Sequence, residues 1–203
     1  MAGGHSIDSV EPIYGLVAIG IVNPAHLKRN SGAKPGDKLI LGKPLGVGVY
    51  SAALKKDQLL ASDYQAMVAT TTQLNTPGPV LACLDGVHAV TDVTGFGLAG
   101  HLLEVCKGSG LRATVNYADL PLLARTREFI QAGLMTGASG RNWASYGDKV
   151  SLAAGLDAAA QHYFGRSAGD LNVGQAAMLA GNAWSVSTGG AAVLPQRAAL
   201  RPD

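Results

Sequence analysis

The residue whose type and surroundings point most directly to chemistry is Asp92, within the stretch 91–97 (TDVTGFG). Apolar residues at 87–90 predict a buried strand before it, and the apolar spacing after it predicts a helix over about 97–107. Ligands of α/β proteins collect where strands end and helices begin. A carboxylate at that place either coordinates a hard cation such as Mg²⁺, or it forms an Asx-turn or caps the helix.

A second candidate site lies at residues 3–6 (GGHS). Two glycines followed by an imidazole and a hydroxyl can offer successive backbone N–H groups to an anion, and the alternative is a plain N-terminal loop. His101 and Glu104, three positions apart on the predicted helix, either face one site or form a solvated pair. The glycines of 42–48 (GKPLGVG) do not form a nucleotide-binding motif, so we interpret that stretch as a strand packed closely against another backbone.

Strands and helices that alternate along the chain have to position these residues, which predicts an α/β fold. The segment 11–22 is typical of one buried strand whose partners lie elsewhere in the sheet. The segment 28–37 is a polar loop rich in turn residues, and we place a domain boundary there. The other expected elements are strands at 38–41 and 112–116, helices at 63–74 (after Ser62 as N-cap), 121–132 and 152–162, and a loop at 133–147.

The composition allows one large domain, or one domain plus part of another, in 203 residues with 47% hydrophobic and 15% charged residues. No basic run interleaved with aromatics accompanies the net charge of +2, so we expect no nucleic-acid partner. The longest apolar run, 14–22, is too short for a membrane helix, and no signal peptide is visible. Cys83 and Cys106 form no metal-binding pair. We expect a cytoplasmic protein with reduced thiols and no membrane contact.

Six stretches, taken together in their order and spacing, resemble the selenophosphate synthetase (selenide, water dikinase) family. The resemblance covers about residues 2–150, which correspond to the second half of a family member. The stretches are 3–8 (GGHSID), 11–16 (EPIYGL), 35–41 (PGDKLIL), 43–46 (KPLG), 91–98 (TDVTGFGL) and 141–147 (RNWASYG).

The resemblance implies an ATP-dependent phosphotransferase that converts selenide, ATP and water into selenophosphate, AMP and orthophosphate with Mg²⁺. It implies two α/β domains of the aminoimidazole ribonucleotide synthetase type, in a homodimer. Residues 1–27 would end the N-terminal ATP-binding domain, and 35–150 would form the C-terminal domain. Carried over by position, Gly4, His5 and Ser6 would contact ATP, and Asp92 would be a Mg²⁺ ligand that bridges metal and phosphates.

Two features depart from the family. Its N-terminal portion, with a reactive Cys or selenocysteine, a catalytic Lys and further metal-binding aspartates, is absent, so we assign no catalytic residue, neither Cys83 nor Cys106. Residues 151–203 form a divergent alanine-rich tail in which only 187–190 (STGG) resemble a family motif. We therefore expect a fragment with little or no activity alone. The alternatives are another ATP-using enzyme of the same superfamily and a non-catalytic interaction module.

Overall fold

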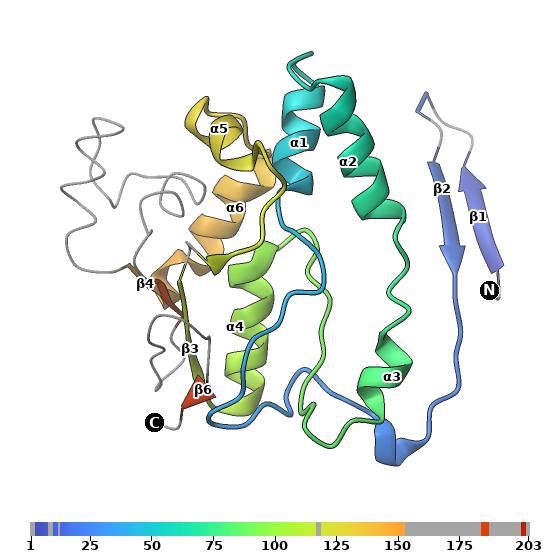
Figure 1. The fold of residues 1–203 in the computed structure, drawn as a ribbon, viewed down its shortest axis with the longest axis vertical. Coiled ribbons are helices and arrows are strands. Elements are labelled where there is room, and N and C mark those ends of the chain that lie inside the picture. Colours follow the sequence, from blue (N-terminus) through green and yellow to red (C-terminus); the bar gives the residue numbers. More distant parts are fainter. Residues whose placement is uncertain are drawn as a thin grey trace.

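Strand β3 (Arg112–Val115) lies inside a four-stranded sheet in the computed structural model, which describes residues 3–7, 10, 11, 13–116, 119–152, 184–186, 200 and 201. The strand order is β4-β5-β3-β6, and each neighbouring pair is antiparallel. Helix α4 (Gly97–Ser109) lies beside β3 (Figure 1) and also packs against β5. Helices and a small sheet confirm the α/β class. The other strands of this sheet are β4 (Val150–Leu152), β5 (Trp184–Val186) and β6 (Leu200–Arg201).

Helix α4 and strand β3 share the first of two hydrophobic clusters. Leu102 and Cys106 are four residues apart, so they lie on one face of α4, where they join Val115 of β3. Gly110 ends the helix at φ +65°, in the left-handed region that favours glycine. Burying one leucine side chain stabilises a fold by about 1.5–3 kcal/mol. This packing therefore fixes the helix that begins shortly after Asp92.

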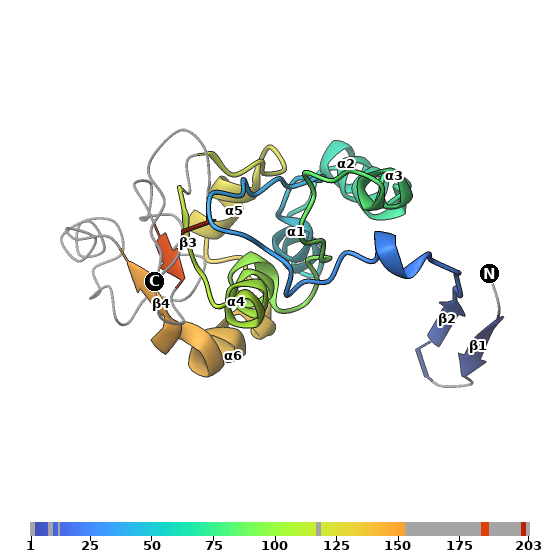
Figure 2. The same ribbon diagram turned by 90° about the horizontal axis from the view of Figure 1, so that it is seen from below.

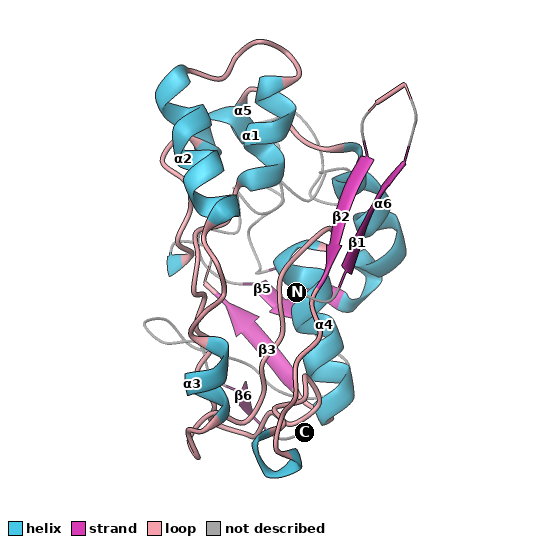
Figure 3. Cartoon of the chain, turned by 90° about the vertical axis from the view of Figure 1, so that its right-hand side faces the viewer, coloured by secondary structure: helices cyan, strands magenta, loops and turns pink. Residues whose placement is uncertain are grey.

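The second cluster forms where α1 (Val47–Leu54), α2 (Ala61–Thr72) and α5 (Thr126–Gln131) meet. Tyr50 and Phe129 pack edge to face there, with ring centroids 5.3 Å apart. Figure 3 shows these three helices together at one end of the molecule, with β3 toward the other end. The described part of the chain thus has two hydrophobic clusters, and α4 belongs to the first.

Strands β1 (Gly3–Ile7) and β2 (Ile13–Val17) form a separate antiparallel pair, which we call the β1–β2 ribbon. Every residue of β2 is exposed. Figures 1 and 2 both show the ribbon at one side of the body, joined to it by an extended segment. The prediction of one buried strand over 11–22 is therefore wrong, because the chain supplies a local partner and the strand ends at Val17.

The predictions of a helix over 97–107 and a strand over 112–116 are confirmed by α4 and β3. Helix α2 starts before the predicted 63–74, because its N-cap is Leu60, whose N–H donates to Asp63 Oδ2 at 3.3 Å, and not Ser62. The expected helix at 152–162 falls outside the described residues, apart from its first position.

The predicted loop at 133–147 is wrong, because most of it is helix α6 (Gly137–Tyr146), followed by η3 (Gly147–Lys149). A Cβ at Gly147 would lie 2.8 Å from two ring atoms of Trp143, so this glycine lets the Trp143 ring pack against the helix end. The predicted helix at 121–132 is shortened to α5, because residues 121–123 instead form backbone hydrogen bonds with Leu45 at 2.8 and 2.9 Å.

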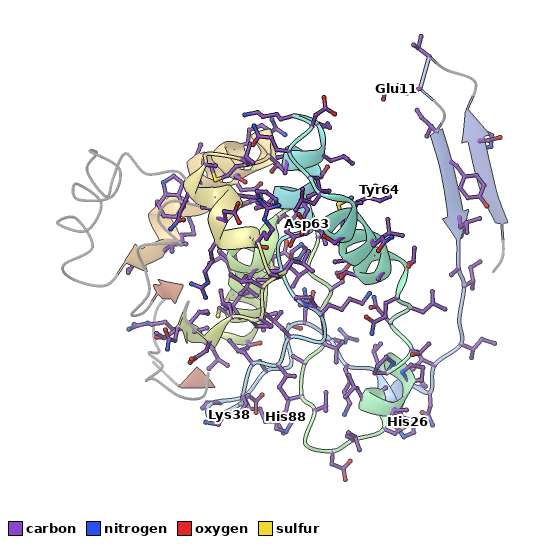
Figure 4. All side chains as sticks on the ribbon, turned by 45° about the horizontal axis from the view of Figure 1, so that its top comes forward. Glu11, His26, Lys38, Asp63, Tyr64 and His88 are labelled. Carbon is purple, nitrogen blue, oxygen red and sulfur yellow. The ribbon has the colours of Figure 1, made fainter. Side chains whose placement is uncertain are left out.

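No strand forms at 87–90 or 38–41 in the described part of the chain. His88 Nδ1 lies 2.7 Å from Asp37 Oδ1, and a Cβ at Gly32 would lie 2.5 Å from the His88 carbonyl oxygen. Figure 4 shows His88 beside the loop around Lys38. The apolar pattern predicted strands paired by backbone hydrogen bonds at 38–41 and 87–90. In the structure, close packing and the contact between His88 and Asp37 hold these two segments together instead.

The stretch 42–48 is also not a strand, because it leads into α1 from Val47. Its Gly46 has φ +123° and lies against the side chain of Thr126 in α5. The backbone partner that we expected is instead the segment 121–123, which is hydrogen-bonded to Leu45. The described elements also include η1 (Pro24–His26) and α3 (Gly78–Ala82). None of the helices in the described ranges is both long and apolar enough to cross a membrane.

Candidate functional site

The Asp92 carboxylate is exposed in the loop that precedes α4. It accepts no hydrogen bond from the other described residues and forms no ion pair with them. The N-cap of α4 is Phe96, without a side-chain cap. Neither the Asx-turn nor the helix cap considered from the sequence is formed. The carboxylate oxygens are therefore open to a ligand, although no strand precedes them.

His101 holds the same loop from the helix side. Its Nε2 accepts a hydrogen bond from the backbone N–H of Thr94 at 3.0 Å, and the Thr94 hydroxyl lies 3.2 Å from the same nitrogen. Because a backbone N–H only donates, Nε2 carries no proton and the neutral ring carries it on Nδ1. Nδ1 lies 3.7 Å from Glu104 Oε2. The side chain of His101 is buried whereas that of Glu104 is exposed, so only the Glu104 side of this pair is solvated.

Helix α6 reaches the loop from another direction. Asn142 Nδ2 donates to the Gly95 carbonyl oxygen at 2.8 Å. The ring of Phe96 lies between those of Tyr146 and His101, with centroid distances of 6.0 and 5.5 Å. Two stretches of the sequence resemblance, 91–98 and 141–147, thus meet in space. The sequence does not predict this contact, because the pattern of 133–147 is typical of a loop, and only the resemblance of both stretches to one family links them.

Gly4, His5 and Ser6 lie in strand β1, so neither the phosphate-binding turn nor the plain loop is formed. His5 pairs with Gly15 in the register, and the His5 and Ser6 side chains are exposed. Successive residues of a strand point to opposite faces, so His5 and Ser6 face different sides of the ribbon. No hydrogen bond or ion pair between described residues joins β1 to the Asp92 loop. The structure therefore leaves the two candidate sites apart (Figures 1 and 2).

Two basic residues within the stretches of the family resemblance, Lys43 and Arg141, occupy different environments. Lys43 Nζ donates to the carbonyl oxygen of Gln73 at 2.5 Å, which gives it a structural role. Arg141 is exposed on α6, next to the residue that holds Gly95. The Arg141 side chain is therefore accessible to solvent or a ligand, whereas the Lys43 ammonium is bound to the Gln73 carbonyl oxygen.

A charged network links α2 to α5 and stands outside the candidate site. Arg125 forms ion pairs with Asp63 at 2.8 Å and with Glu128 at 2.5 Å (Figure 4 labels Asp63). The hydrogen bond from Arg125 holds the pKa of the Glu128 carboxyl below its ordinary value. The carboxylates of Asp63 and Glu128 thus neutralise the guanidinium of Arg125, so they stabilise the fold and are not open to a ligand.

The two thiols differ in their surroundings. Cys106 is buried in the α4–β3 cluster, and burial raises the pKa of its thiol to about 11. Cys83 is exposed, with its Sγ 3.8 Å from His26 Nδ1. The buried thiol stays protonated near neutral pH and acts as a packing group.

A cation at Asp92 would have to take most of its ligands from elsewhere. Across the described ranges, no three His, Cys, Asp or Glu side chains gather into a metal site. Protein-bound Mg²⁺ commonly uses one or two carboxylates, with waters and substrate phosphates as its other ligands. A single open carboxylate therefore fits a cation that arrives with a phosphate ligand, and it does not fit a cation caged by this chain alone.

Comparison with known proteins agrees with the resemblance given by the sequence motifs. The family described as AIR synthase related protein, C-terminal domain, matches residues 34–146. The chain is 84% identical over 161 residues to the selenide, water dikinase of Dechloromonas aromatica, covering 79% of this chain and 46% of that protein. Identity is 65% over 161 residues for the enzyme of the same name from Burkholderia ambifaria, with the same coverage, and 53% over 152 residues for that of Rhizobium meliloti, covering 75% and 44%. The chain spans less than half the length of these curated relatives.

Proposed function

This chain belongs to the AIR synthase related protein family through its C-terminal domain, and we propose that it is part of a selenide, water dikinase. The observation that carries the proposal is the 84% identity over 161 residues to an enzyme of that name. The reaction takes selenide, ATP and water to selenophosphate, AMP and orthophosphate. Because the chain spans 46% of that relative, the activity is proposed for the complete enzyme. We assign 1–27 to the end of the ATP-binding domain, 35–150 to the C-terminal domain and 151–203 to a divergent tail.

We propose Asp92 as the residue of this chain that holds the Mg²⁺ of the reaction. Its carboxylate is exposed and is not engaged by another described residue, which leaves both oxygens for a cation. A bound Mg²⁺ neutralises the charge of phosphates that would otherwise repel each other. Asp92 contributes by fixing where that charge is neutralised.

We propose Gly4, His5 and Ser6 as ATP contacts. The strand places Gly4 and Ser6 on one face and His5 on the other, so a ligand that touches all three has to lie along the edge of β1. The proposal further takes ATP and selenide as substrates, a homodimer as the assembly and the cytoplasm as the location, all of them on the resemblance to the family.

The test of the Asp92 assignment is equilibrium binding of ATP to the purified chain, with and without Mg²⁺. We expect Mg²⁺ to strengthen ATP binding and Asp92→Asn to abolish that gain. The matched control is Asp85→Asn, since Asp85 is another exposed aspartate in the loop before α4. Equal Mg²⁺-dependent binding by Asp92→Asn and the unchanged chain would overturn the assignment.

The test of the activity is reconstitution. The chain is mixed with the part of the Dechloromonas aromatica relative that the match does not cover, and AMP formation is followed with and without selenide. We expect selenide-dependent AMP only from the mixture. Selenide-dependent AMP from this chain alone would contradict its proposed role as a part of the enzyme. A well-folded mixture that forms no AMP would contradict the proposed function itself.

A further inference from the structure

Two neighbouring backbone groups just beyond Asp92 are bound by side chains from two different helices. The N–H of Thr94 donates to His101 Nε2 at 3.0 Å, and the carbonyl oxygen of Gly95 accepts from Asn142 Nδ2 at 2.8 Å. These residues follow Asp92 by two and three positions. Whatever fixes their backbone also limits where the Asp92 carboxylate can lie.

The position of His101 on α4 explains its contact. Side chains of a helix lean toward its N-terminus, so a residue in the second turn covers the loop that enters the helix. The residue is 7% exposed, and its ring also meets the ring of Phe96. Burial and ring packing hold the imidazole in place, and they make it a fixed acceptor for the Thr94 N–H.

Asn142, on α6 and 47 positions after Gly95, binds the loop from the other side. Tyr146 lies on the same face of α6, four residues later, and packs edge to face with Phe96. The loop is therefore wedged between α4 and α6, with one polar and one aromatic contact from each helix. The Asp92 carboxylate itself stays exposed.

We propose that His101 and Asn142 are positioning residues that place the Asp92 carboxylate for its cation. The proposal rests on the proposed role of Asp92 as a cation ligand. Neither side chain needs to touch ATP or metal, because each acts through the loop backbone. Loss of an outer residue that orients a metal ligand typically weakens metal binding by about 10- to 100-fold, and we expect a loss in that range here.

The experiment uses the full chain and two measurements. Hydrogen exchange of the Thr94 amide, in the chain without nucleotide, directly reports the hydrogen bond from this amide to His101. Binding of Mn²⁺ with ATP, followed by electron paramagnetic resonance of free Mn²⁺, reports its consequence. His101→Leu removes the acceptor but keeps a buried apolar side chain, and His101→Gln returns an acceptor near the position of Nε2.

We expect His101→Leu to speed exchange of the Thr94 amide and to weaken Mn²⁺–ATP binding at least tenfold, with most of both effects reversed in His101→Gln. Asn142→Ala should weaken binding in the same direction. Asn75→Ala, at an exposed asparagine outside these contacts, is the matched control and should change neither. If His101→Leu does not fold, His101→Gln and Asn142→Ala still decide the outcome.

Two results overturn the inference, and they are distinguishable. Faster Thr94 exchange with unchanged Mn²⁺–ATP binding in the folded variants would show that the hold exists but does not position Asp92, and the proposed function would stand. In the second result, the Thr94 amide of the unchanged chain exchanges slowly but the chain binds no Mn²⁺–ATP. Asp92 would then not be a cation ligand, and His101 and Asn142 would have no ligand to position.

Discussion

The Asp92 loop and the β1–β2 ribbon both carry residues proposed for ATP and Mg²⁺, but they are supported differently. The loop is bound by His101 and Asn142 and lies at the start of a helix with a buried face. In the ribbon, the described side chains are exposed, including large apolar ones such as Tyr14 and Leu16. A two-stranded ribbon is at best marginally stable in water. The difference teaches that this chain fixes one half of the proposed site by its own packing, and leaves the other half to further contacts.

The largest contrast should appear when a leucine is shortened in each region. Leu102 is 5% exposed and Leu16 is 53% exposed. We expect Leu102→Ala to lower the free energy of unfolding by about 2–5 kcal/mol, because it leaves a cavity in the α4–β3 cluster. Leu16→Ala should change it by less than about 0.5 kcal/mol. Urea unfolding measures both, and equal losses would break the comparison.

A smaller loss is expected where α6 ends. Gly147→Ala puts a Cβ about where the Trp143 ring lies, so the ring or the helix has to shift. We expect a loss of about 1–3 kcal/mol, typical of overpacking, together with faster hydrogen exchange at the Asp92 loop. Gly140→Ala is the control within the same helix, since nothing lies within 4 Å of its added Cβ. It should be neutral or stabilising by up to about 1 kcal/mol. A tolerated Gly147→Ala would mean that α6 does not support the loop.

The smallest effect is expected from an exposed ion pair outside both regions. Arg125 lowers the pKa of Glu128 from its ordinary 4.5, so the folded state favours the carboxylate. This stabilisation is present above the ordinary pKa and is lost as the pH falls through the lower pKa of the folded state. Glu128→Gln should therefore lower the Tm slightly at pH 7, and this difference should shrink at an acidic pH well below 4.5. The same shift at both pH values would exclude the ion pair as its cause.

Part of this arrangement could be predicted from the sequence. Helix α4 was predictable because Leu102 and Cys106 follow helical spacing, but the helix continues through Gly108, where its end was expected, and stops at Gly110. Asp92 was selected through its glycine-rich surroundings and the family resemblance. The sequence could not predict that the Asp92 side chain neither caps α4 nor forms an Asx-turn, because this depends on how the loop is held in the folded chain.

The rest depended on contacts distant in the chain. Helix α6 (GASGRNWASY) has two glycines and a serine in its first four positions and no apolar period, so local propensity favoured a loop. The apolar residues at 87–90 suggested a strand, but the His88–Asp37 contact and packing on Gly32 hold that segment. The roles of His101 and Asn142 became visible only when α4 and α6 were placed around one loop.

The extended segment between the β1–β2 ribbon and the body limits how far apart these two regions can lie. Residues 18–23 join the end of β2 to η1, and even a fully extended chain of that length spans only about 20 Å. The ribbon therefore has to stay within that distance of Pro24. Its encounter with any surface nearby is intramolecular, at an effective concentration on the order of millimolar. A weak docking contact, too weak to be seen between separate molecules, would suffice to fix it.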